Sequence, residues 1–121
     1  MLKDLDVKYA SINQLALKLS GGNQQKVLFG KCLFTDPKLL ILDEPTKGID
    51  VGSKEEIYEL IGKLTDQGLT IILISSEVEE ICHLADRVLV MVNGKIKDIY
   101  KGDKINEKDI TSCYLQTEKR K

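Results

Sequence analysis

The sequence lacks several features that would point to whole classes of protein. Its 18 basic and 19 acidic residues give a net charge of −1, whereas a nucleic-acid-binding groove would need a basic face. The three widely spaced cysteines form no Cys-x-x-Cys pair, so we expect free, mostly buried thiols of a reducing compartment rather than a zinc site or disulfides. No apolar run approaches the length of a membrane span. We therefore expect no nucleic-acid partner. We also expect that any link to a membrane is made through another protein.

A loop that cradles phosphate groups is also absent. The pattern Gly-x-x-x-x-Gly-Lys-[Ser/Thr] does not occur, and Gly30-Lys31 fits it only in part because the first glycine is replaced by Gln25. The only histidine, His83, has no second ligand residue beside it, so a position on a helix surface is favoured over a metal site. The chain by itself is therefore not expected to hold the β-phosphate of a nucleotide.

The most informative segment that is present runs from Leu39 to Pro45. Four apolar residues precede Asp43 and Glu44, which predicts a strand buried on both faces of a parallel sheet. The carboxyl ends of such strands are where ligands bind. A magnesium ion and a water molecule to be activated would explain two adjacent acids at this position. The alternative is an ordinary strand that ends in a charged turn.

A second informative segment is Leu19-Ser20-Gly21-Gly22-Asn23-Gln24. Ser20 has the side chain of a helix cap, and the glycines let the backbone approach a ligand closely. The helix predicted over 23–34 would point its N-terminus at this loop, and helix N-termini attract anions. The serine hydroxyl and the glycine N–H groups are therefore candidate phosphate donors. The alternative is an ordinary Ser-Gly-Gly loop that only caps a helix.

The remaining pattern predicts alternating helices and strands. Ser53 and Glu56 have the spacing of a capping box, and Asn93-Gly94 marks a tight hairpin turn. The fold class expected is α/β, a truncated sandwich with a mostly parallel sheet and a terminal antiparallel hairpin. Further helices are expected over 53–66, 77–84 and 106–115, and strands over 69–74, 87–92 and 95–100.

These segments resemble the motifs of ATP-binding cassette (ABC) ATPases, which have a P-loop NTPase-like fold. Leu19–Gln24 is similar to the signature motif and Leu39–Pro45 to Walker B; Gly48-Ile49-Asp50 lies at the D-loop position and Ile74-Ser75-Ser76 at the switch loop. The residues of these motifs are most similar to those of the second cassette of ribose-, galactose- and xylose-type sugar importers. The resemblance implies three parts: a remnant of the helical subdomain (1–18), the carboxy-terminal half of a cassette (19–115) and a charged tail (116–121).

The resemblance also implies roles for individual residues. Asp43 would orient Mg²⁺ bound to ATP, and Glu44 would act as the general base toward the attacking water. Asp50 would link the two sites of a cassette pair. Ser76 replaces the histidine that most cassettes carry, and a hydroxyl cannot take over proton shuttling by an imidazole. The residues expected to close over ATP held by the opposing cassette are Ser20, Gly21, Gly22, Asn23 and Gln24.

The partners implied are a second cassette, transmembrane permease subunits and, indirectly, a periplasmic or extracellular sugar-binding protein. The protein would lie in the cytoplasm, peripheral on the inner face of the membrane. The family's phosphate cradle is expected upstream of Met1, so the chain alone would be inactive, and apolar surface near 1–18 favours self-association. Alternatives are a nucleotide-free docking module and an importer of nucleosides or autoinducer. DNA-repair ATPases would show coiled-coil heptads, and translation-factor cassettes a histidine in place of Ser76.

Overall fold

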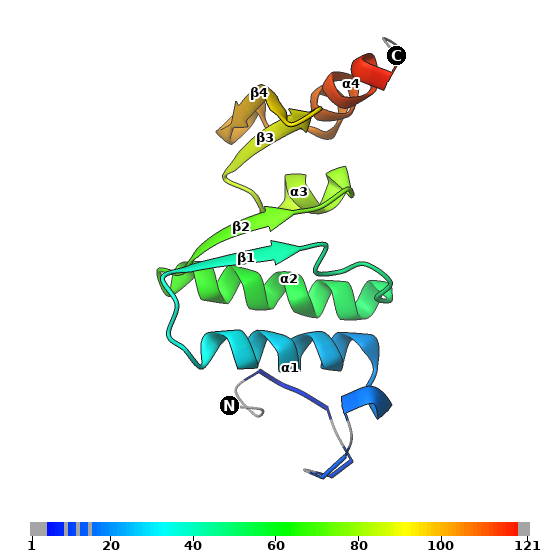
Figure 1. Ribbon diagram of the computed structural model, residues 1–121, viewed down its shortest axis with the longest axis vertical. Helices are drawn as coiled ribbons and strands as arrows, with labels where there is room; N and C mark the ends of the chain where they lie inside the picture. Colours follow the sequence, from blue (N-terminus) through cyan, green and yellow to red (C-terminus); the bar gives the residue numbers. More distant parts are fainter. Residues whose placement is uncertain (1–4, 9, 12, 15, 119–121) are drawn as a thin grey trace. The chain divides into compact units, whose positions relative to one another are not determined.

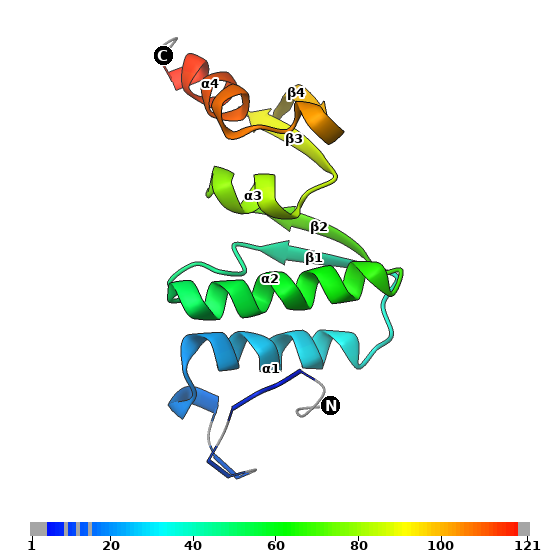
Figure 2. The ribbon, with the colours of Figure 1, turned by 180° about the vertical axis from the view of Figure 1, so that it is seen from behind.

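The computed structural model describes residues 5–8, 10–11, 13–14 and 16–118. These residues form two compact units, Met1–Ile74 and Ser75–Lys121, shown from opposite sides in Figures 1 and 2. The alternation of Leu5, Val7 and Tyr9 predicts a short extended segment, and Ile12, Leu15 and Ala16 have helical spacing. Tyr9, Ile12 and Leu15 lie outside the described residues. Within the described part, no helix is both long enough and apolar enough to cross a membrane.

The first unit is built from two helices and a pair of parallel strands. In chain order it contains η1 (Ala16–Lys18), α1 (Gly21–Leu33), β1 (Leu39–Asp43), α2 (Val51–Asp66) and β2 (Thr70–Ile74). β1 and β2 pair in parallel with Leu39 opposite Thr70 and Asp43 opposite Ile74. Both views show α1 and α2 side by side, with α2 next to the strands. Parallel pairing in the described residues is confined to these two strands.

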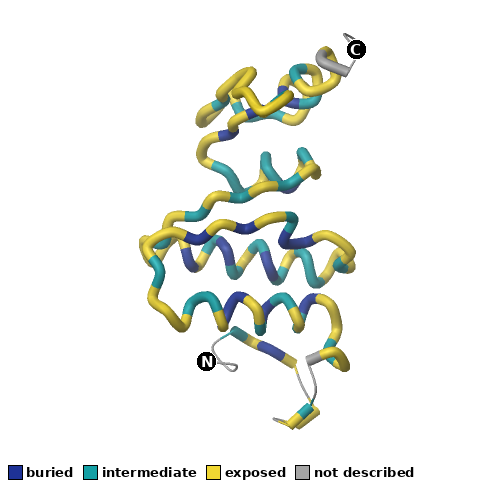
Figure 3. The backbone as a smooth tube through the Cα atoms, in the orientation of Figure 1, coloured by how far each residue is buried: buried dark blue, intermediate teal, exposed yellow. Residues whose placement is uncertain are grey.

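Burial on β1 alternates along the strand. Leu40 and Leu42 are buried, whereas Leu39 and Ile41 are 48% and 60% exposed, and Figure 3 shows this alternation. The prediction of a strand buried on both faces is therefore wrong for the described chain, because α2 covers one face only. The uncovered face continues onto β2. We call this surface the open face; it consists of Leu39, Ile41, Ile72 and Ile74.

The helices contribute most of the remaining core of the first unit. The spacing of Ile57, Leu60, Ile61 and Leu64 predicts one apolar stripe on a helix. Ile57, Ile61 and Leu64 of α2 are buried and Leu60 is half-buried, which confirms the stripe. On α1, Phe29 is 2% exposed, but Leu28 is 50% exposed. The apolar residues from Val27 to Leu33 predict a largely buried helix, and this prediction is wrong for Leu28, because α2 and residues 5–8 cover only part of α1.

The N-termini of both helices are capped by side chains. Ser20 Oγ accepts a hydrogen bond from Asn23 N at 3.3 Å, so α1 begins at Gly21, slightly earlier than predicted. At α2 the cap is Asp50, whose Oδ1 accepts from Ser53 N at 3.0 Å. The predicted capping box with Ser53 as cap is wrong, because an aspartate three residues upstream caps equally well and lengthens the helix.

The second unit packs a hairpin against two helices. It contains α3 (Val78–Leu84), β3 (Arg87–Val92), β4 (Lys95–Lys101), η2 (Gly102–Lys104) and α4 (Glu107–Glu118). β3 and β4 are antiparallel, and Asn93-Gly94 turns with φ of 49° and 75°, as the sequence predicts. The buried core is Val88, Val90 and Ile110.

Two finer expectations about side chains in the described residues fail. The sequence pattern of the last helix predicts that Ile110, Cys113 and Tyr114 face inward; Ile110 is buried, but Tyr114 is 50% exposed. The three cysteines are free, as expected, but each is only half-buried. Asn106 caps α4 as predicted, since its Oδ1 accepts from Asp109 N at 2.9 Å. Single turns and caps are thus better predicted than burial, which depends on what packs around each element.

Candidate functional site

The two acids lie where β1 ends. Asp43 is the last residue of the strand and is exposed, and Glu44 is half-buried. Glu44 N donates to Ile74 O at 2.8 Å, so pairing with β2 extends one residue beyond β1. Glu44 has φ of +48°, a left-handed conformation that costs a non-glycine residue about 1–3 kcal/mol. The chain therefore leaves the sheet at Glu44, in a strained conformation of the kind found at functional sites.

A short ordered loop connects the acids to α2. Lys47 N donates to Glu44 O and Ile49 N to Thr46 O, both at 3.2 Å, and Thr46 is 1% exposed. The loop ends at Asp50, whose two carboxylate oxygens accept from the Ser53 amide and the Ser53 hydroxyl. These hydrogen bonds, the amide first, lower the pKa of Asp50. Asp50 is exposed and charged at neutral pH, and it holds the start of α2.

The Ser-Gly-Gly loop is ordered by its own side chains. Ser20 Oγ accepts from both the Asn23 amide and Asn23 Nδ2, the latter at 2.9 Å. Gln24 Nε2 donates to Leu19 O at 3.2 Å. Ser20, Gly21 and Gln24 are exposed, Asn23 is half-buried and Gly22 is buried. The loop therefore presents Ser20, Gly21 and Gln24 to its surroundings, whereas Gly22 faces the protein.

The burial of Gly22 has a cause that sequence reasoning missed. A Cβ added there would lie 2.6 Å from Ser53 Cβ and 2.7 Å from Ser53 Oγ, closer than real side chains pack. The first turns of α1 and α2 thus touch through this glycine. A Cβ added at Gly21 would meet Ile49 at an ordinary 3.8 Å. The two glycines therefore differ only in how tightly α1 and α2 pack around them, and this packing leaves no local signal in the sequence.

Three of the predicted motifs converge at one end of the first unit. The N-termini of α1 and α2 and the C-terminus of β1 lie at the same end of the helix-and-strand layer in both ribbon views. The Ser-Gly-Gly loop, the acids and Asp50 are therefore gathered at that end. Ser76 is exposed and belongs to the second unit, where Ser75 Oγ accepts from Glu77 N at 3.0 Å.

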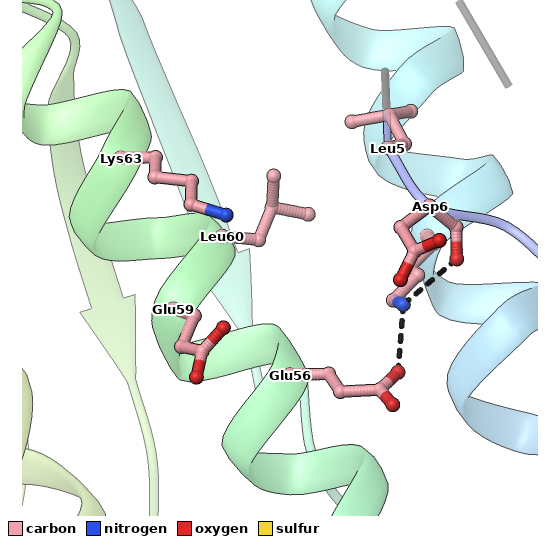
Figure 4. A pocket seen from close by; sticks show the side chains of 7 residues that line it. Leu5, Asp6, Glu56, Glu59, Leu60 and Lys63 are labelled. Carbon is pink, nitrogen blue, oxygen red and sulfur yellow. Dashed lines mark hydrogen bonds and ion pairs between the residues drawn. The ribbon is translucent and has the colours of Figure 1, made fainter. Parts of the chain in front are cut away.

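One pocket of the described part is too small to hold a nucleotide. A pocket between α1, α2 and residues 5–6, shown in Figure 4, has a volume of about 80 Å³, whereas ligand pockets measure roughly 300–1,000 Å³. No group of three or more metal-ligating side chains occurs among the described residues. Asp43 and Glu44 nevertheless fit Mg²⁺, which proteins bind through one or two carboxylates together with phosphates and water.

Comparison with known sequences gives the same assignment as the motifs. A family model described as ABC transporter matches residues 1–47. The ribose import ATP-binding protein RbsA of Caldanaerobacter subterraneus is 53% identical over 110 residues, covering 91% of this chain and 22% of the relative. The xylose import ATP-binding protein XylG of Escherichia coli K12 is 45% identical over 117 residues, covering 97% and 23%. The chain thus spans less than a quarter of the curated relatives it matches.

Solved structures extend the likeness to the fold. MJ1267, an ATP-binding cassette of an ABC transporter, superposes with a TM-score of 0.77 at 27% identity, covering 97% of this chain and 44% of that one. The dimeric cassette MJ0796 superposes with a TM-score of 0.70 at 26% identity, covering 83% and 43%. The motifs in their order, the geometry of the first unit and these likenesses agree: the chain belongs to the ABC transporter family and corresponds to part of an ATP-binding domain.

Proposed function

We propose that the chain contributes the signature loop, the Walker B acids and the D-loop to an ATP-hydrolysing cassette of a carbohydrate importer. The observation that carries this proposal is the convergence of the three motifs at one end of the first unit. The import of ribose or xylose named for the relatives supports a monosaccharide as the solute. The phosphate cradle would come from a part of the cassette that this chain does not contain.

The roles of the two acids follow from their chemistry and position. Asp43, exposed at the carboxyl end of β1, would hold Mg²⁺ on ATP, and the ion when bound would neutralise phosphate charge. Glu44 would accept a proton from the attacking water as general base. The left-handed backbone of Glu44 directs the chain away from the sheet directly after Asp43. The two neighbouring carboxylates would therefore have different roles, with Asp43 holding the ion and Glu44 accepting the proton.

The signature loop would serve a nucleotide held by a second cassette. Ser20, Gly21 and Gln24 are the exposed members of this loop, and they stand at the N-terminus of α1, a 13-residue helix. Hydrogen bonds to a charged group contribute about 1.5–3 kcal/mol each, compared with about 0.3–1 kcal/mol from the helix dipole. Recognition would therefore depend on the serine hydroxyl and the exposed N–H groups, with Asn23 and Gly22 shaping the loop from behind.

The partners and place in the cell complete the proposal. The likeness to a dimeric cassette supports a second cassette as partner, with Asp50 near their shared interface. Permease subunits would couple ATP hydrolysis to transport on the cytoplasmic face of the membrane, and a sugar-binding protein outside would deliver the solute. Nucleosides and autoinducer remain alternative solutes, which uptake assays with each solute class would separate.

The test uses a complete cassette that contains this sequence, paired with its partner cassette. We expect Glu44→Gln to retain ATP binding and to lower turnover at this site by about 10²-fold or more, since a general base contributes about 10²–10⁴-fold. Glu59→Gln, an exposed carboxylate on α2, is the matched control and should leave turnover unchanged. Turnover that survives Glu44→Gln would contradict the role of Glu44.

Ser76 provides a second test of the same site. Because a hydroxyl cannot carry a proton or a positive charge as imidazole does, we expect Ser76→His to raise turnover at the site that contains Glu44. A Ser76→Ala variant should not do so. Unchanged turnover in Ser76→His would argue against a switch-loop role for this position.

A nucleotide-free docking module is the second candidate function. The absence of a phosphate cradle from the sequence favours it for the chain alone. Equilibrium titration of the 121-residue chain with labelled ATP tests both candidates, and we expect no micromolar binding. Micromolar affinity in the absence of any other protein would contradict both the docking module and our assignment of the cradle to another part of the cassette.

A further inference from the structure

The signature loop and the D-loop lie at the starts of two different helices, yet the structure ties these helices together at two successive turns. The first tie is the close approach of Gly22 to Ser53. Ser53 is also the residue that engages Asp50, through its amide at 3.0 Å and its hydroxyl at 2.9 Å. A displacement of Ser53 by α1 would therefore be passed directly to the carboxylate of Asp50.

The second tie is an ion pair one turn further along both helices. Lys26 Nζ on α1 lies 2.7 Å from Glu56 Oε2 on α2, and the Lys26 residue is 3% exposed. Lys26 Nζ also donates to Asp6 O at 3.1 Å, and Figure 4 shows both bonds. The hydrogen bond from Lys26 lowers the pKa of Glu56, so Glu56 is a carboxylate at neutral pH.

The two ties restrict different movements. The contact of Gly22 with Ser53 leaves no room for the helix starts to move closer, since the intervening space is smaller than one Cβ. The ion pair opposes their separation, because a buried ammonium that loses its carboxylate is left uncompensated. Neither residue pair is local in sequence. Together they fix the distance between the two loops from both directions.

We infer that Lys26 and Ser53 are positioning residues that hold the signature loop and the D-loop as one rigid unit. The functional meaning of this inference rests on the function proposed above. A second cassette that engages Ser20 and Gly21 would then move Asp50 with them. The signature loop and the D-loop would therefore respond to binding of the partner at the same time, without a separate conformational step.

The test measures amide hydrogen exchange by NMR in the 121-residue chain without nucleotide. The amides to follow are Ser53 and Lys54, which donate to Asp50. We expect Gly22→Ala, although it lies on α1, to accelerate exchange at these α2 amides by about tenfold or more, because it displaces Ser53 and opens the first turn. Gly21→Ala is the matched control, with room for its methyl group, and should change exchange by less than about twofold.

Lys26→Met tests the second tie without a steric clash, and it decides the matter if Gly22→Ala does not fold. We expect exchange at Ser53 and Lys54 to rise about threefold or more, while Lys31→Met, an exposed lysine on the same helix, has no effect. Charge reversal, Lys26→Glu with Glu56→Lys, should restore part of the protection. A merely structural role would instead accelerate exchange evenly along α2 as far as Leu64.

Unchanged exchange at Ser53 and Lys54 in Lys26→Met and in any folded Gly22→Ala variant would overturn the inference. Even acceleration along all of α2 would overturn it as well. Because no nucleotide is present, this outcome is independent of ATP hydrolysis. Failure of the proposed function would appear instead in the turnover of the Glu44→Gln and Ser76→His variants.

Discussion

At the residue scale, the ion pair between Lys26 and Glu56 is asymmetric. The Lys26 side chain is 4% exposed, whereas that of Glu56 is 42% exposed. Glu56 therefore keeps much of its hydration, and Lys26 depends on Glu56 and on Asp6 O for compensation of its charge. Loss of the carboxylate should consequently be far more damaging than loss of the ammonium.

We predict that Glu56→Gln lowers the free energy of unfolding by about 1–3 kcal/mol, the cost of an incompletely satisfied buried polar group. Lys26→Met should cost less than about 1 kcal/mol, because Met occupies similar space and the remaining carboxylate is partly hydrated. Urea denaturation of both variants checks this order. Equal costs, or a greater cost for Lys26→Met, would show that the pair is not buried on the lysine side.

Single residues also show how far sequence reasoning reaches. The Ser20 cap and the Asn93-Gly94 turn were predictable, because each depends on bonds within a few residues. The left-handed conformation of Glu44 was not, since glutamate has no intrinsic preference for it and the surrounding loop imposes it. Gly22 was predicted as a ligand contact, but its close approach to Ser53 depends on tertiary packing.

At the element scale, the start of α2 depends on one carboxylate. The hydrogen bonds from Ser53 lower the pKa of Asp50 below its ordinary value of 3.8. A lowered pKa in the folded state means that the stabilisation is present above pH 3.8 and is lost as pH falls through the lower folded value. The cap thus holds α2 in place at neutral pH and weakens in acid.

We predict that Asp50→Ala lowers the unfolding temperature by a few degrees at neutral pH, and that the difference from the unmodified chain narrows in acid, below pH 3.8. Asp50→Asn should lower the unfolding temperature less than Asp50→Ala, because its amide oxygen still accepts a hydrogen bond from Ser53 N. The cap formed by asparagine should not depend on pH. Thermal unfolding followed by circular dichroism over this pH range checks both. An undiminished difference in strong acid would contradict the cap.

The stability of the second unit should depend on pH in the alkaline range, because of Tyr100 on its hairpin. Burial first, and then hydrogen bonding to Cys113, raises the pKa of Tyr100 from 10 to about 12. A raised pKa in the folded state means that the stabilisation is complete below pH 10 and is lost as pH rises through about 12.

We therefore predict a late tyrosine ionisation step, near pH 12, in an ultraviolet absorbance titration. The second unit should lose stability as this step occurs. Tyr100→Phe should remove this step and the loss of stability that accompanies it. If the late step persists in Tyr100→Phe, another tyrosine is responsible for it, and the packing of Tyr100 against Val88 and Ile110 does not protect its hydroxyl.

Elements were predicted better than their surroundings. The bounds of β3 and the stripe of α2 follow from periodicity, which is a local property of the chain. Burial of β1 on both faces and of α1 over most of its circumference did not follow, because each depends on neighbouring layers. The acids and the loop were predicted to be a site from their sequence, while the contact between the first turns of α1 and α2 was visible only in three dimensions.

At the scale of the whole molecule, the open face of the first unit is the most consequential surface. Its four side chains, Leu39, Ile41, Ile72 and Ile74, are 47–60% exposed. They form one contiguous strip, because Ile41 lies opposite Ile72 in the parallel register. The sequence predicts apolar surface near residues 1–18, where Leu17 is 89% exposed, and the sheet face is a further apolar surface.

An uncovered apolar sheet face with unpaired strand edges promotes association. We predict that the isolated chain self-associates with increasing concentration in sedimentation velocity, and that Ile41→Thr with Ile72→Thr reduces this association while the β-branched side chains preserve the strands. Val51→Thr is the matched control, since Val51 is 78% exposed on α2 and outside the open face, and it should associate like the unmodified chain. If the Ile41→Thr, Ile72→Thr double variant associates as strongly as the unmodified chain, the contact between copies lies outside the open face, because the double variant weakens only the burial of that face.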